Sequence, residues 1–399
     1  MKFKESVLFT KKELRRFCTY RLLFGISYSL MIPIIPLFYK SIGLSTVIIG
    51  IIISLYGLSK TITQIPFGIF ADKIGDKLAL TLALGLMALV PIGYTLVKNN
   101  ILSGSIYVIQ GAILGMAAPS TYSILARSID KRKRGESTGL ASAVFTFGGG
   151  VGAIIAGIIV TKLNDFNRVF YISSFGILLT LIYVIFKIPK EKPARQVNKS
   201  KVSLKEILKE INIYKLKHKI IMLGAMAFLG DYIYSCVVAL IHFYGQSVLG
   251  VSTLYTSSII SVYLIVFGLG APIAGWVSDR IGNKAQLVLS FSVMNLSLLG
   301  LVIIRNVSVF TITIIIYFLG ATFLNAALQG SLSEFGSNPR IKGFVFGFVG
   351  SSESFGYALG PLISSYVYEI NKEWLFLGLL IVSLLITALY VLFYNKSKI

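Results

Sequence analysis

Charged residues are scarce in this sequence, and so are the residues from which catalytic and metal sites are built. Only 14% of the 399 residues are Asp, Glu, Lys or Arg, whereas 55% are hydrophobic, which leaves too little polar surface for a soluble globule. The two cysteines, Cys18 and Cys236, lie in different apolar runs and predict no disulfide framework. No H-E-x-x-H motif, P-loop or nucleophile elbow is present. We therefore expect an integral membrane protein with no enzymatic activity, cofactor or metal site.

Long apolar runs take the place of the missing charge. Hydrocarbon offers the backbone no hydrogen-bond partners, so uninterrupted apolar runs of roughly 20 residues predict transmembrane helices. Twelve such runs begin near Phe17, Thr46, Leu78, Ile101, Glu136, Arg168, Lys219, Thr253, Ala285, Ser308, Ile341 and Glu373. The sequence therefore predicts an all-α membrane protein with twelve transmembrane helices.

The basic residues are distributed unevenly about these helices. The net charge is +22, and 30 of the 38 Lys and Arg fall on one predicted side of the membrane. Six fall on the other side, namely Lys40, Lys98, Lys162, Arg168, Arg305 and Lys372. By the positive-inside rule, both termini and the central loop are cytoplasmic in a multi-pass protein of the cell membrane. The excess positive charge thus reflects the orientation of the helices in the lipid bilayer, and we expect no nucleic-acid partner.

One long polar stretch, residues 188–218, separates six predicted helices from the other six. It divides the chain into an N-terminal bundle at 1–187 and a C-terminal bundle at 219–399. Ser203 and Glu206 form a capping-box pattern in this linker, before an amphipathic segment. We expect an interfacial helix there, with a solvated linker as the alternative for the remainder.

The two halves repeat one another. GIFADKIGDKLAL, which begins at Gly68, returns 207 residues later as GWVSDRIGNKAQL, which begins at Gly275. The spacing G-x8-G-x3-G in the fifth apolar run also returns in the eleventh. These repeats predict two pseudo-symmetric six-helix bundles. The small residues favour either helix bending or tight helix packing, and the bending candidates are Gly139, Gly148, Gly152, Gly356, Gly360 and Pro361.

Three ionisable residues lie deep inside predicted helices, where a charge costs about 2.5–3.5 kcal/mol. Lys60 precedes Asp72 by 12 residues, and Glu353 follows Lys342 by 11, so both lie roughly 17 Å along their helices. Their opposite signs predict a pair between the two bundles, either state-dependent or permanent. Asp231 is the carboxylate of the seventh run and a candidate proton carrier.

Polar residues also follow one face of several predicted helices. The first, fourth, seventh and tenth runs are expected to line a wet cavity, whereas the third, sixth and twelfth are expected to face lipid. The His in the seventh run is either a titrating group or an ordinary hydrogen-bonding residue. The candidate cavity residues are Tyr28, Tyr107, Gln110, Ser235, His242, Asn325 and Gln329.

The repeated turn resembles the loop motif of the major facilitator superfamily, roughly G-x-L-A-D-R-x-G-R-K, and this resemblance covers nearly the whole chain. It implies that two bundles rock about a central site. It also implies a conformational latch formed by Gly68, Asp72, Lys73, Gly75, Lys77 and Arg127, with a second copy at Gly275, Asp279, Arg280, Gly282 and Lys284. Asp76 and Asn283 depart from the motif, and Glu334 stands where the second copy needs a base, so a weaker second latch is expected.

Within that superfamily, the glycine spacing of the fifth run is most similar to the drug/proton antiporter branch. The resemblance implies a secondary transporter that exports a small amphipathic solute, coupled to protons and acting as a monomer. The antiporter pattern has an arginine where Tyr107 stands. That departure favours the alternative, an uncoupled or uptake carrier for a nutrient such as a sugar or an amino acid.

Overall fold

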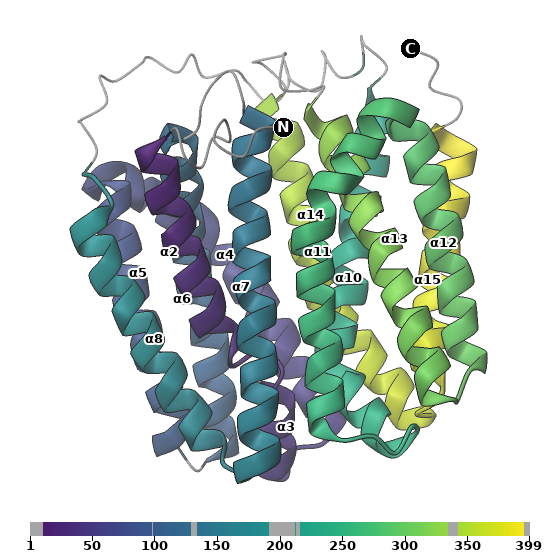
Figure 1. The fold of residues 1–399 in the computed structure, drawn as a ribbon, viewed down its shortest axis with the longest axis horizontal. Coiled ribbons are helices and arrows are strands. Elements are labelled where there is room, and N and C mark those ends of the chain that lie inside the picture. Colours follow the sequence, from purple (N-terminus) through teal and green to yellow (C-terminus); the bar gives the residue numbers. More distant parts are fainter. Residues whose placement is uncertain are drawn as a thin grey trace. The chain divides into compact units, whose positions relative to one another are not determined.

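The structure is a computed structural model that describes residues 11–97, 99–128, 134–190, 212, 216–333 and 342–394. Within these ranges it consists of helices and contains no strand (Figure 1). The predicted linker helix around Ser203 and Glu206 lies outside the described residues. The long helices are α2 (Lys12–Ser29), α4 (Thr46–Ile74), α5 (Asp76–Leu96), α6 (Asn100–Ser128), α7 (Arg134–Leu163), α8 (Phe166–Lys187), α10 (Lys217–Ser247), α11 (Thr253–Ile281), α12 (Asn283–Ile303), α13 (Val307–Ser333), α14 (Lys342–Ile370) and α15 (Trp374–Leu389).

The predicted all-α membrane fold is confirmed, and eleven predicted helix starts lie within two residues of the observed ones. The first helix begins at Lys12, five residues before the predicted Phe17, because hydropathy marks entry into the membrane and not the start of the helix. Ten long helices of the described chain are apolar enough to cross a membrane. The other two are α2, whose first turns are charged, and α14, which carries the polar run Ser351–Ser354.

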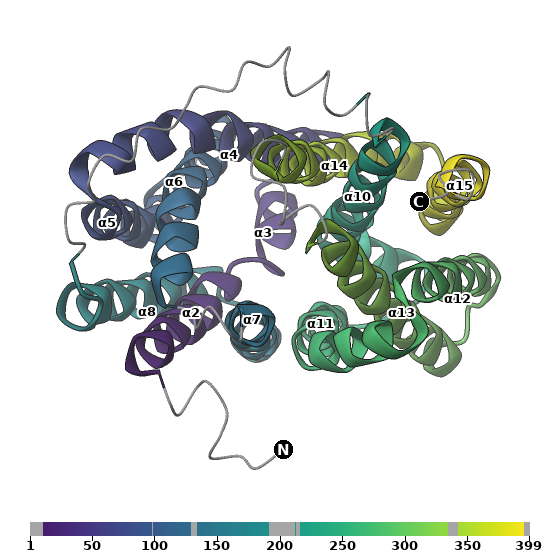
Figure 2. The same cartoon turned by 90° about the horizontal axis from the view of Figure 1, so that it is seen from above.

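The chain forms two compact units. The first comprises Met1–Lys192 with Val237–Pro272, and the second comprises Pro193–Cys236 with Ile273–Ile399. In the first unit α4 packs on α6, α2 packs on α7 and α8, and α5 packs on α8; in the second, α12 packs on α13 and α15 (Figure 2). The predicted boundaries of the two bundles, 1–187 and 219–399, remain a prediction.

Glycines bring helices into backbone contact in the same way in both halves. Gly148 and Gly152 of α7 face the carbonyl oxygens of Leu22 and Ile26 on α2. In the second half, Gly356 of α14 faces the Phe228 carbonyl of α10. The next glycine contact of α14 with α10 lies four residues later. Contacts this close leave no room for a Cβ atom.

That next contact is made by Gly360, which lies against the carbonyl of Tyr232 and the hydroxyl of Ser235. Pro361 follows within α14, which is one helix from Lys342 to Ile370. The residues predicted to bend helices thus lie at tight helix crossings, except Gly139, whose surroundings lie outside the described residues. Bending itself remains a prediction.

The first predicted transmembrane helix is divided, a feature that hydropathy does not predict. It ends as α2 at Ser29 and resumes as the short α3 (Ile35–Ser41). Pro33 and Pro36 lie at this break, and because proline has no N–H, the carbonyls of Ser29 and Ile32 lose their helical donors. The Met31 carbonyl accepts from both Ile34 and Ile35 instead. The break is therefore a direct consequence of the two prolines.

Gly152→Ala is expected to lower the stability of the protein. The new methyl group would meet the Ile26 carbonyl, and overpacking of this kind costs about 1–3 kcal/mol, more than the ~1 kcal/mol that Ala gains over Gly in a helix. The matched control is Gly350→Ala, because a Cβ atom at Gly350 meets nothing within 4 Å.

Thermal unfolding can be followed with a thiol-reactive dye, since Cys18 and Cys236 are both buried and free. We expect a lower melting temperature for Gly152→Ala and an unchanged or higher one for Gly350→Ala. Equal melting temperatures for the two variants would contradict the role given to the glycine contacts.

Candidate functional site

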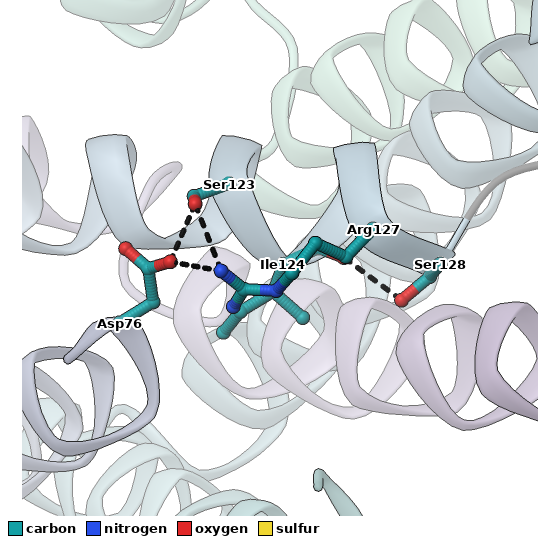
Figure 3. Close-up of polar contacts among 5 residues, drawn as sticks. All are labelled: Asp76, Ser123, Ile124, Arg127 and Ser128. Atoms are coloured by element: carbon teal, nitrogen blue, oxygen red, sulfur yellow. Dashed lines mark hydrogen bonds and ion pairs between the residues drawn. The ribbon is translucent and has the colours of Figure 1, made fainter. Parts of the chain in front are cut away.

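An ion pair stands where the first repeated turn joins the end of α6 (Figure 3). Gly75 has a φ of 95°, a conformation that glycine adopts without strain, and it turns the chain from α4 into α5. Asp76, the first residue of α5, accepts a hydrogen bond from Ser123 and lies 2.5 Å from Nη1 of Arg127. Its carboxylate also lies at a helix N-terminus, which favours negative charge. The turn is thus tied to α6 by charge and by hydrogen bonds.

Asp76 has a structural role that the motif alone does not reveal. In the motif it is only a departure, and Arg127 is expected to act with Asp72. The surroundings of Gly68 and the side chains of Asp72 and Lys73 lie outside what the structure describes, so the pairing of Asp72 remains a prediction. The signal present in the sequence is an acidic residue in place of a base, at the first position of the helix that follows the turn.

The other predicted residue of this turn, Lys77, anchors a different helix. Its Nζ donates to the carbonyl of Ile185 at 2.7 Å, near the end of α8. Exposed carbonyls at a helix C-terminus carry partial negative charge, so the ammonium group is favourably placed there. The turn between α4 and α5 therefore contacts both α6 and α8.

The second repeated turn is an uncharged version of the first. Gly282 has a φ of 83° and begins α12 as Gly75 begins α5. Asn283 takes the place of Asp76 and accepts from Ser278 at 2.5 Å. Gly330 leaves room for the Asn283 side chain, because a Cβ atom at Gly330 would lie 2.6 Å from the Asn283 side-chain oxygen. An amide thus occupies the place of the carboxylate.

The remaining predicted residues of the second turn form no described ion pair. The Arg280 guanidinium lies 3.8 Å from the centroid of the Trp276 ring, a cation–π contact. Lys284 is exposed, and nothing lies within 4 Å of a Cβ atom built at Gly275. The side chain of Asp279 lies outside the described residues.

A buried network of tyrosines links four helices of the first unit. The Tyr94 hydroxyl donates to Gln110 at 2.8 Å, Gln110 donates to the Tyr28 hydroxyl at 3.3 Å, and that hydroxyl bonds to Tyr56 at 2.6 Å. The Tyr56 ring stacks on Tyr107 with centroids 4.6 Å apart. The structure thus brings together three predicted cavity residues from α2 and α6.

Tyr56 and Tyr94 are members of this network that the sequence pattern does not predict. Tyr56 shares a helical stripe with Lys60, which is a usable signal. Tyr94 belongs to the third long helix, which the sequence pattern predicts to face lipid, yet its side chain is only 1% exposed. The hydroxyl tips of the network are satisfied inside the unit, as buried tyrosines require.

The second unit carries the two membrane-embedded carboxylates. Asp231 of α10 and Glu353 of α14 are both half-buried. The glycine contacts between these helices fix their register, and the rings of Tyr234 and Tyr357, on the same two helices, lie 6.2 Å apart. A carboxylate on each of two packed helices is therefore built into one unit.

The other predicted cavity residues are divided between the two units. His242 is fully buried in the first unit, with Nδ1 2.5 Å from the hydroxyl of Thr256. Ser235 belongs to the second unit and donates to the Tyr232 carbonyl at 2.9 Å. On α13, Asn325 is half-buried and Gln329 is exposed.

Most of the chain matches a single protein-family model. The model of the Major Facilitator Superfamily matches residues 17–338. The protein belongs to this superfamily. It is therefore a multi-pass membrane protein of a transporter family, which is not an enzyme class.

The names of proteins similar to this chain refer to several different functions. "Multidrug resistance protein MdtG" of Proteus mirabilis is 25% identical, and the match covers 86% of each chain. "Riboflavin transporter RibZ" of Clostridioides difficile is 21% identical over 87% of this chain and 90% of its own. An MFS-type transporter of Methanocaldococcus jannaschii is 24% identical, but the match covers 50% of this chain and only about half (51%) of that protein.

Solved structures of the superfamily share the fold. A bacterial homolog of the human lysosomal transporter Spinster, in an inward-facing and unoccupied conformation, superimposes with a TM-score of 0.77. It is 13% identical, and the match covers 96% of both chains. At this identity the similarity establishes the shared architecture of the long helices.

Asp76→Asn and Arg127→Gln are expected to be energetically coupled. Arg127 is 44% exposed, so solvent screens the pair, and we expect a coupling free energy of about 1 kcal/mol or less. The double variant should then unfold at nearly the same temperature as either single variant. Strictly additive losses in thermal unfolding would show that the ion pair contributes nothing to the joint between α5 and α6.

Proposed function

We propose that the protein exports a small amphipathic solute across the cell membrane by alternating access, in exchange for protons. The observation that carries this proposal is the pair of half-buried carboxylates, Asp231 and Glu353, within helices of one unit. An ionisable group at this depth is costly and marks an ion or substrate pathway by default. Because a neutral carboxyl costs less there than a charged one, each group can bind a proton in one state and release it in another.

The substrate class follows from the side chains of the first unit. Tyr28, Tyr56 and Tyr107 combine flat apolar rings with hydroxyls, and Gln110 adds an amide. Surfaces of this composition suit solutes that have both an aromatic or aliphatic body and a polar group. The relative from Proteus mirabilis, named for multidrug resistance, supports the same class and the direction of export.

The remaining parts of the proposal concern conformation and topology. Lys60 of α4 is half-buried, and we propose that it forms a pair with Glu353 in one state of the cycle. The turn of Gly75, Asp76 and Lys77, together with Asp72 and Arg127, acts as the latch of the cytoplasmic side. Both termini lie in the cytoplasm, and the transporter works as a monomer.

A second candidate is an uncoupled or uptake carrier for a nutrient. The relative named as a riboflavin transporter favours it. Tyr107 favours it as well, because the antiporter pattern has a positive charge at that place and here a stacked phenol ring stands instead. The two candidates differ in whether a proton gradient drives accumulation of the solute.

Transport by the purified protein in liposomes separates these candidates. Lipophilic cations, sugars, amino acids and riboflavin are each offered with and without an imposed pH gradient. If the protein is a proton-coupled exporter, we expect an amphipathic solute to accumulate only when the pH gradient is imposed. Movement that ignores the gradient supports the second candidate, and movement of none of these solutes contradicts both.

Asp231→Asn and Glu353→Gln are expected to uncouple transport. Each variant keeps the size of the side chain but cannot exchange a proton, so we expect solute exchange between the two sides to persist. Accumulation driven by the pH gradient should fall to the level of protein-free liposomes. The matched control is Glu369→Gln, the same change at an exposed position of α14, which should leave both activities intact.

Full gradient-driven accumulation in both carboxylate variants would rule out their role in coupling. For the proposed pair, Lys60→Met should impair transport, because it leaves the carboxyl of Glu353 without its partner. Wild-type transport and stability in Lys60→Met would remove the pair from the mechanism while leaving the role of Asp231 intact.

A further inference from the structure

An arginine lies in the middle of α2, where a membrane helix usually carries an apolar residue. Arg21 follows the first residue of this helix, Lys12, by nine positions, which is about 14 Å along the helix, and it precedes the last residue by eight. Its side chain is half-buried. An ionisable group inside a membrane segment is costly and marks a functional site by default. Arg21 has no part in the latch or in the proton coupling proposed above.

The guanidinium of Arg21 lies over an aromatic ring of the neighbouring helix α7. Its Cζ is 3.8 Å from the centroid of the Phe145 ring. The same ring stacks on Phe24, three residues further along α2, with the two centroids 6.2 Å apart. A snorkelling side chain would extend back toward the start of α2 and the membrane surface. The cation–π contact with Phe145 instead holds the positive charge among the helices of the first unit.

The helices around Arg21 supply no carboxylate at its level. α2 packs on α6, α7 and α8 (Figure 2). Four stretches of the first unit contain no Asp or Glu, namely residues 14–71, 77–129, 137–164 and 166–190. On α2 and α7 the acidic residues are Glu13, eight residues before Arg21, and Glu136, nine residues before Phe145. These separations are about 12 and 14 Å along the helix. None of the ion pairs of the described residues includes Arg21.

A guanidinium that stacks by one face keeps its edge for hydrogen bonding. Its N–H donors lie in the plane of the group and match two oxygens of a carboxylate or sulfonate in a bidentate pair. Arg21 and Phe145 are both half-buried, so neither is sealed within the protein. The tyrosine network of the first unit begins at Tyr28, seven residues or about 10 Å further along α2. A positive charge, an aromatic ring and a polar network thus follow one another along one helix.

We propose that Arg21 binds the negatively charged group of the transported solute, which is an organic anion with an aromatic body. The guanidinium donates to the oxygens of the anion, and the Phe145 ring holds the guanidinium in place. Lys60, the other positive group deep within helices of this unit, adds to the preference for an anion and repels a lipophilic cation. This inference names the substrate class of the proposed function and rests on it.

Three probes that share one aromatic body test the preference for negative charge. They are naphthalene-2-sulfonate, which is an anion, naphthalene-2-sulfonamide, which is neutral, and 2-naphthyltrimethylammonium, which is a cation. Binding is measured by calorimetry on the full chain in nanodiscs of phosphatidylcholine. We expect the wild type to bind the sulfonate about tenfold or more tightly than the sulfonamide, and the cation most weakly, because charge-assisted hydrogen bonds are the strong ones. Equal affinities for the three probes, or binding of none, would overturn the proposal.

Substitutions of Arg21 show whether this residue causes the preference. Arg21→Gln removes the charge and should lower the affinity for the sulfonate to that for the sulfonamide. Arg21→Lys keeps the charge but loses the planar pair of donors, so we expect an intermediate affinity for the sulfonate and an unchanged one for the sulfonamide. The matched control is Arg15→Gln, the same change at an exposed position of α2, which should bind the sulfonate as the wild type does. Wild-type affinity for the sulfonate in either Arg21 variant would overturn the proposal, so one folded variant is enough.

The headgroup of an anionic lipid offers similar chemistry, and a change of lipid separates the two sources. In nanodiscs that contain phosphatidylglycerol, we expect the wild type still to bind the sulfonate more tightly than Arg21→Gln does. Equal affinities of the two proteins in that lipid would mean that the headgroup occupies Arg21, and the proposal would be wrong.

Transport in liposomes distinguishes failure of this inference from failure of the proposed function. Gradient-driven accumulation of a lipophilic cation, without binding of the sulfonate, would remove Arg21 from substrate recognition and leave proton-coupled export in place. Binding of the sulfonate that depends on Arg21, together with transport that ignores the pH gradient, would refute the proton coupling but not the anion site.

Discussion

Inside a bilayer, every polar group must find its partner within the protein, and the rest of this structure depends on that constraint. Helices satisfy their own backbone, and glycine contacts let neighbouring backbones approach closely enough for hydroxyls to bond across the gap. Ser59 and Thr63 of α4 donate to carbonyls of α6 in this way, and Ser173 of α8 donates to α2. In the second unit, Asn295 of α12 bonds to both Thr387 and Ser383 of α15. These polar side chains therefore stabilise the packing of neighbouring helices.

Polar groups that are energetically costly inside the membrane indicate where transport takes place. Asp231, Glu353 and Lys60 each place an ionisable group where an apolar one would be cheaper. The break at Pro33 gives up helical hydrogen bonds at membrane depth. Groups that serve packing have partners in both halves at equivalent places, as the contacts of Gly152 and Gly360 show. The costly groups differ between the halves, which fits a role in transport and not in the shared scaffold.

The fold could be predicted from the sequence because its signals are local and repeated. Apolar runs locate the helices, and the repeat that begins at Gly68 and Gly275 indicates the duplication directly. What the sequence does not reveal depends on contacts between distant segments. The Asp76–Arg127 pair joins residues 51 apart, and the role of Tyr94 depends on the direction in which α5 turns its face. The helix break has a local signal in Pro33 and Pro36, but proline within membrane helices is common enough that the signal alone does not decide it.

The central claim is that solute and proton move in exchange for one another. The most direct measurement uses the wild-type protein in liposomes that contain a pH-sensitive dye, with an outward gradient of the transported solute and no imposed pH gradient. We expect downhill movement of the solute to drive protons in the opposite direction, so that the internal pH falls only when protein and solute are both present. Solute flux with no change in internal pH would contradict it.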